Sequence, residues 1–91
     1  MSFLKSGMLV EICSINENSG KAVGIFVPNV SMIKNKWIIN NINCRSLVLF
    51  DTIGVIIDDF DNDYWSKDCK VVLLNNKLCR VFSGNLRLLN E

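Results

Sequence analysis

Short apolar segments, each four to six residues long, recur along this 91-residue chain with turn-forming residues between them. Most of them are rich in Val and Ile, whose branched side chains suit the pleated surface of a sheet. Spacing of this kind is typical of a small β-barrel or β-sandwich. The segments are residues 8–13, 22–27, 46–50, 53–58, 70–74, 78–82 and 86–89.

The composition favours strands over helices along the whole chain. Nine Val, ten Ile and one Thr give 20 β-branched residues, whereas the helix formers Ala and Glu occur once and three times. Twelve Asn supply turn and left-handed backbone positions that Gly and Pro usually fill. We expect an all-β fold, a small antiparallel barrel of about six to eight short strands, forming one domain over residues 1–91.

Residues 29–45 allow two interpretations. Val30, Ile33 and Trp37 fall at helical spacing, yet most residues in this segment are poor helix formers. The other interpretation is a strand hairpin that turns at Asn35. We prefer the hairpin because it agrees with a weak internal repeat of the chain.

The repeat divides the chain into residues 7–45 and 46–89. Each half contains an apolar strand segment, then a segment with a central glycine, Gly24 or Gly54, and then a hairpin segment. Short β-rich segments resemble each other easily, so chance similarity is the alternative to a duplication. Halves of about 40 residues seldom carry separate cores, so they would share one barrel or pack tightly together.

The segments 70–74 and 78–82 form a hairpin whose pairing can be predicted from its turn. A two-residue turn at 75–76 places Val72 opposite Cys79 and Phe82 opposite Cys69, so the two sulfurs do not meet. In this register both faces of the hairpin are apolar, although a half-solvated strand should alternate apolar and polar residues. Either the N-terminal half or a second subunit must therefore cover the second face, and we favour a homo-oligomer.

Residues 46–89 resemble a Src-homology-3-like small β-barrel. Two strand segments, 46–50 and 53–58, precede an acidic loop and the hairpin, and Ser83, Gly84 and Asn85 then make a single tight turn before a short last strand. Barrels of this kind are common in phage genomes, and the heavy use of Asn, Ile and Lys is typical of an AT-rich genome, such as that of a marine phage or its host. The chain lacks the Trp-Trp pair and the Pro of the signalling members, so the resemblance does not imply binding of proline-rich peptides.

The acidic segment 58–65 is the most distinctive stretch of the chain because it interleaves aromatic rings with carboxylates. In Src-homology-3-like domains the equivalent loop faces the peptide: the rings form a groove and the carboxylates attract a basic ligand. The alternative is that the large rings cap the open end of the barrel. The candidate residues for a protein or peptide interaction are Phe60, Tyr64, Trp65, Asp59 and Asp61.

The same stretch matches a calcium loop only in part. Asp59, Asp61 and Asp63 alternate as ligands would, but Tyr64 stands where Gly is needed and Lys70 where the bidentate Glu belongs. The four cysteines include no Cys-x-x-Cys pair and the chain has no His, so we expect no zinc site and buried free thiols. We predict no metal, no cofactor and no catalytic site.

Basic residues suggest an alternative to a protein-binding function. Lys34, Lys36 and Arg45 surround Trp37, a combination in which cations contact phosphates and an indole stacks on a base. The net charge is only +1, and the acidic loop would repel a polyanion, so nucleic acid is not the favoured partner.

No apolar run reaches the roughly 18 residues of a membrane helix, and residues 1–5 lack the features of a signal peptide. We therefore expect a cytoplasmic protein without a membrane partner. The favoured function is a non-enzymatic interaction or assembly module that self-associates and binds an unknown protein partner.

Overall fold

The computed structural model of the chain describes residues 4–15, 22–40, 44–60 and 68–89. These residues form nine strands and one short 3-10 turn, without an α-helix, and every strand pair is antiparallel. The all-β antiparallel class is therefore confirmed, with one strand more than the six to eight expected. The strands are β1 (Leu9–Ile12), β2 (Gly24–Pro28), β3 (Val30–Ile33), β4 (Lys36–Ile39), β5 (Arg45–Leu49), β6 (Ile53–Phe60), β7 (Cys69–Leu74), β8 (Lys77–Phe82) and β9 (Leu86–Leu88), with the 3-10 turn η1 (Ser83–Asn85) between β8 and β9.

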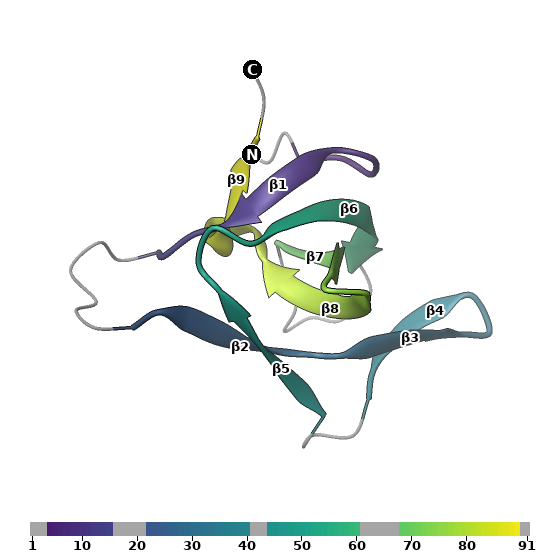
Figure 1. The fold of residues 1–91 in the computed structure, drawn as a ribbon. Helices are drawn as coiled ribbons and strands as arrows, with labels where there is room; N and C mark the ends of the chain where they lie inside the picture. Colours follow the sequence, from purple (N-terminus) through teal and green to yellow (C-terminus); the bar gives the residue numbers. More distant parts are fainter. Residues whose placement is uncertain (1–3, 16–21, 41–43, 61–67, 90–91) are drawn as a thin grey trace.

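Five strands form the main sheet in the order β8-β7-β6-β1-β9 (Figure 1). The β2–β5 and β3–β4 pairs form two separate two-stranded sheets. β2 and β3 follow each other along the chain and pass alongside β8. An isolated β-bridge between Asn29 and Cys79 joins this part of the chain to β8. Pro28, which has no N–H to donate, immediately precedes this bridge. The ladders of the described residues therefore do not close into the continuous barrel that we expected.

The two predicted halves of the chain share the main sheet. β1 from the first half lies between β6 and β9 from the second half. Both halves contain a hairpin with a two-residue turn, but this likeness does not establish a duplication, which stays a prediction.

Both hairpins owe their tight turns to Asn. Lys34 and Asn35 connect β3 to β4 with φ of 51° and 65°, and Asn75 and Asn76 connect β7 to β8 with φ of 51° and 67°. Two successive positive φ angles define a type I′ turn, whose twist matches that of the flanking strands, and Asn tolerates this conformation better than most residues. The hairpin interpretation of residues 29–45 is confirmed.

The register predicted for β7 and β8 is also confirmed. Val72 lies opposite Cys79 and Cys69 lies opposite Phe82. Because the turn length sets the register, the sequence of two asparagines between apolar runs was sufficient to predict it.

β6 contains a bulge at Ile57 that changes which face its later residues occupy. Pairing with β7 shifts between Ile56 and Asp58, so β6 has one extra residue there. The Ser6 hydroxyl donates a 2.8 Å hydrogen bond to the Ile57 carbonyl, which satisfies the backbone at the bulge. Because side chains alternate along a strand, the extra residue moves Asp58 and Phe60 to the opposite face from the one that Ile56 occupies.

The main core lies between the five-stranded sheet and the β2–β5 pair. Its members come from β1, β2, β5, β6, β7, β8 and β9, so every strand outside the β3–β4 hairpin contributes. The buried residues are Val10, Ile12, Val27, Val48, Ile56, Val72, Leu74, Cys79, Val81 and Leu86.

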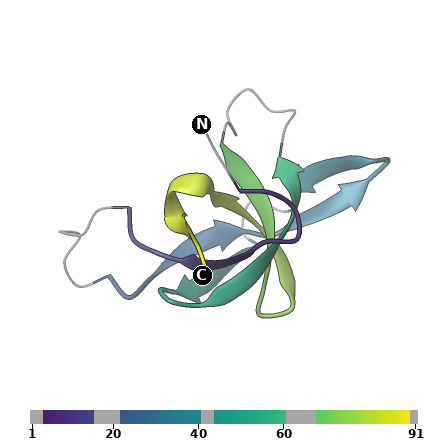
Figure 2. The same cartoon turned by 90° about the horizontal axis from the view of Figure 1, so that it is seen from above.

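A second, smaller core lies on the other face of β7, where the β3–β4 hairpin packs. Phe60, Cys69 and Val71 are buried there with Val30, and partly buried Trp37 packs against them. The second apolar face of the β7–β8 hairpin is thus covered, in part, by the N-terminal half of the same chain. Figure 2 shows the β3–β4 hairpin extending outward beside β7 and β8.

Candidate interaction site

The end of β6 holds the acidic and aromatic residues that the sequence marked out. Phe60 is only 3% exposed and belongs to the second core, so it fills space inside the protein. The Arg80 guanidinium lies 6.0 Å from the centre of the Phe60 ring, within the range of a cation–π contact. Tyr64, Trp65 and Asp61 lie outside the described residues.

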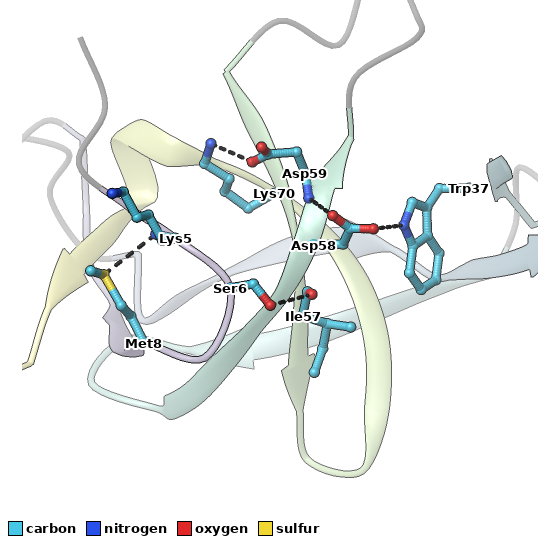
Figure 3. Close-up of polar contacts among 8 residues, drawn as sticks. All are labelled: Lys5, Ser6, Met8, Trp37, Ile57, Asp58, Asp59 and Lys70. Atoms are coloured by element: carbon cyan, nitrogen blue, oxygen red, sulfur yellow. Dashed lines mark hydrogen bonds and ion pairs between the residues drawn. The ribbon is translucent and has the colours of Figure 1, made fainter. Parts of the chain in front are cut away.

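Asp58 connects β6 to the β3–β4 hairpin. The Trp37 indole Nε1–H donates a 3.0 Å hydrogen bond to Asp58 Oδ2, and the Asp59 backbone N–H donates a 2.8 Å bond to Oδ1 (Figure 3). These two hydrogen bonds, with that of Trp37 the stronger influence, lower the pKa of the Asp58 carboxyl below its ordinary value. The contact holds the half-buried Trp37 ring in place against the second core.

Asp59 is engaged with Lys70, which lies directly opposite it on β7. Lys70 Nζ lies 2.6 Å from Asp59 Oδ1, and Lys70 is buried although it carries a charge (Figure 3). A buried ammonium needs a partner because burial alone would disfavour its charge. Asp59 therefore supplies the counter-charge for the buried Lys70 ammonium.

Replacing Trp37 by Phe should raise the pKa of Asp58 toward its ordinary value of about 3.9, because the main hydrogen bond to the carboxylate is lost. A lowered carboxyl pKa stabilises the folded state above the unfolded pKa, and this stabilisation disappears as pH falls through the folded pKa. The difference in unfolding free energy between wild type and the variant should therefore be largest near neutral pH and shrink below about pH 4.

Carbon-detected NMR titration of the Asp58 carboxyl, with urea unfolding at several pH values, measures both effects. Asn replacement at Asp58 is the matched control, since in that background the effect of Trp37→Phe on the unfolding free energy should no longer depend on pH. An unchanged Asp58 pKa in the Phe variant would show that the indole bond does not set it.

The basic residues of the nucleic-acid alternative do not gather around an open indole face. Lys34 and Lys36 are exposed at the β3–β4 turn, and Arg45 is exposed at the start of β5. Trp37 lies between these positions in the sequence but is partly buried, and its polar edge is occupied by Asp58.

An exposed apolar surface lies on the β2–β5 pair instead. Phe26 and Leu47 are directly opposite each other, and Leu49 is the next residue on the same face of β5. Their exposed fractions are 65%, 49% and 52%. We call these three residues the β2–β5 outer face. Val27 and Val48 point the other way into the main core.

The β2–β5 outer face is not among the candidate residues that the sequence predicted. The signal was present, because residues 22–27 and 46–50 are apolar at both odd and even positions, as in a strand with two apolar faces. Nothing local to these segments showed which of the two faces the rest of the chain would cover.

The described cysteines are all free thiols, and three of them have little reactivity. Burial is the largest influence on Cys13, Cys69 and Cys79, and it raises the pKa of each thiol. Cys44 is exposed. Among the residues that the structure describes, no three His, Cys, Asp or Glu side chains gather as a metal site would require.

A scan against protein-family models and searches of curated proteins and of solved structures found no match to this chain. The part of the chain described by the structure contains no helix long and apolar enough to cross a membrane.

Proposed function

We propose that this chain is a non-enzymatic interaction module that associates with copies of itself through the β2–β5 outer face. The observation that carries the proposal is the contiguity of that face. Isolated exposed apolar residues are normal on protein surfaces, whereas adjacent large ones mark interaction sites. Phe26 and Leu47 are cross-strand neighbours, and together with Leu49 they expose an aromatic ring and two aliphatic side chains on one surface.

We also propose a Src-homology-3-like architecture for the chain. It is supported by the order of the main sheet, in which β1 pairs with both β6 and the last strand β9, and by the 3-10 turn that connects β8 to β9. In this proposal the barrel strands are β1, β6, β7, β8 and β9, whereas the resemblance in the sequence covered residues 46–89 and included the segment 46–50, which pairs with β2 outside the main sheet.

Self-association is favoured over peptide binding at the acidic segment. Phe60 is buried, and Asp58 and Asp59 already bind Trp37 and Lys70. Phe60 would have to leave the second core before it could contact a ligand. Contact through the β2–β5 outer face does not require a side chain to leave the core, since the side chains of this face are exposed.

Light scattering on a sizing column tests the proposed function. We expect a stable multiple of the 10.3 kDa chain mass whose value does not change when a short single-stranded oligonucleotide is added at low salt. A replacement of Leu47 by Ser should shift the mass toward that of the single chain, because Leu47 lies beside both Phe26 and Leu49 on the face.

Two results would contradict the proposal. A 10.3 kDa monomer at all concentrations would exclude self-association. A monomer that gains mass only with the oligonucleotide, and loses this binding steeply as salt rises, would support the nucleic-acid alternative.

A further inference from the structure

One edge of β5 pairs with no strand that the structure describes. Hydrogen bonds from Phe50 N–H to the Val23 carbonyl and from Asn29 N–H to the Cys44 carbonyl establish which residue pairs of the β2–β5 ladder are bonded. Since bonded and non-bonded pairs alternate in an antiparallel ladder, Ser46 and Val48 direct their backbone groups toward β2. The N–H and C=O groups of Arg45 and Leu47 consequently point to the opposite edge, where no described strand pairs with β5.

This edge lacks the usual protection against pairing with another strand. Natural edge strands are often guarded by prolines, bulges or inward-pointing charges. β5 contains none of these at its centre, and its only charged residue is Arg45 at one end. A hollow of about 270 Å³ lies beside the strand, between β5 and the turn that connects β7 to β8. This hollow separates β5 from the turn, and no hydrogen-bonded ladder joins the two.

We infer that β5 of one subunit pairs antiparallel with β5 of a second copy of this chain, centred on Leu47. The inference rests on the self-association proposed above and places its contact at the β5 edge of the β2–β5 outer face, where the Leu47 side chains of the two copies meet. Pairing about Leu47 places Leu47 opposite Leu47 of the partner subunit and Arg45 opposite Leu49 of the partner subunit. The outward backbone groups of β5 then face outward groups of the other copy, as a bonded ladder requires.

In the same register the Leu47 side chains of the two copies lie side by side on one face. Residues directly opposite in a ladder share a face, so the two β2–β5 outer faces join into one four-stranded surface that carries Phe26 and Leu47 from both copies. A twofold axis through Leu47 closes the arrangement at two subunits, so it makes a dimer and no open filament.

Charge supports this antiparallel pairing. Arg45 begins β5, and Asp51 follows two residues after the strand ends. Antiparallel self-pairing brings Arg45 of each subunit near Asp51 of the other, at both ends of the shared ladder. The exposed Asp51 carboxylate lies 4.0 Å from Arg87 within its own chain, too long a separation for a strong hydrogen bond. It thus remains able to bind a second guanidinium.

Disulfide cross-linking at the twofold axis tests the register directly. Leu47→Cys is placed in a chain that also carries Cys44→Ser, so that the exposed native thiol is absent. Opposite residues of a bonded pair have Cα atoms about 5.5 Å apart, which is within the range that a disulfide spans. Under mild copper–phenanthroline oxidation we expect a covalent dimer on a non-reducing gel.

Ile33→Cys in the same background is the matched control, since Ile33 is equally exposed but lies on the β3–β4 hairpin. Cross-linking at Leu47 should be about tenfold faster or more, because pairing raises the effective thiol concentration toward the millimolar range. Equal rates for the two variants would overturn the inference.

Leu47→Pro provides a second test by light scattering. Proline removes the outward N–H of residue 47 without removing a donor that bonds β2, so the folded subunit should keep its circular dichroism and lose the dimer. Leu47→Lys, which guards the edge with a charge, should have the same effect if the proline variant does not fold.

The outcomes separate the two proposals. If the Leu47→Pro and Leu47→Lys variants are dimers like the wild type, and Leu47→Cys cross-links slowly, the β5 pairing is overturned while self-association stands. A monomeric wild-type chain overturns both. Dimer loss in the variants together with fast cross-linking at Leu47 supports both.

Discussion

Replacing Phe60 by Ala should lower the free energy of unfolding by about 3–5 kcal/mol. The ring is 3% exposed and packs with Val30, Cys69 and Val71 in the second core, so its removal loses apolar burial and leaves a cavity. A small domain has a stability of about 5–15 kcal/mol, so much of the total would be lost. Urea unfolding followed by tryptophan fluorescence and circular dichroism measures the change.

Phe82→Ala is the matched control for this prediction. Phe82 is the same residue type on a neighbouring part of the sheet, but it is 46% exposed. Its replacement should cost about 1 kcal/mol or less. If the Phe60 variant were as stable as the Phe82 variant, Phe60 would not be a core residue, and a ligand-binding role for it would regain support.

Replacing Gly54 by Ala should destabilise the protein by about 2–3 kcal/mol through overpacking. A Cβ at this position would lie 2.6 Å from the Leu73 carbonyl oxygen and 2.6 Å from Leu74 Cδ2. A backbone carbonyl within the main sheet cannot rotate away, so β6 and β7 would have to separate. The midpoint of urea unfolding should fall without a change in its slope.

Gly84→Ala tests whether steric contact with the backbone is the cause. Its Cβ would approach the ring of Phe82, at 2.7 Å from Cε2, and that exposed side chain can turn aside. The cost should stay below about 1 kcal/mol. Equal destabilisation by the two substitutions would indicate a general cost of replacing glycine, with no special role for the close approach at Gly54.

Local features of the chain were predictable where turn chemistry determines them. The two-residue turn at Asn75 and Asn76 was enough to predict the register of β7 with β8, including the separation of Cys69 from Cys79. The hairpin at Asn35 was the preferred of two interpretations, and it formed because positive φ angles are accessible to Asn.

The candidate site was less predictable, because one extra residue in β6 changes the face of everything that follows. Without the bulge at Ile57, Phe60 would lie on the same face as Ile56. The bulge turns Phe60 and Asp58 toward the β3–β4 hairpin, where they meet the second core and Trp37. No residue type in this segment marks the bulge, since the carbonyl of Ile57 is satisfied by Ser6, 51 residues away.

Side-chain branching and local backbone preferences are enough to specify the all-β class, the short strands and the two asparagine turns. Which apolar faces are covered depends on how distant segments pack. The β3–β4 hairpin packs over the face of β7 that we had assigned to a second subunit, while Phe26 and Leu47 stay exposed on the β2–β5 pair. Period-two alternation shows that a strand has two apolar faces, but which face is buried depends on long-range packing that no local pattern encodes.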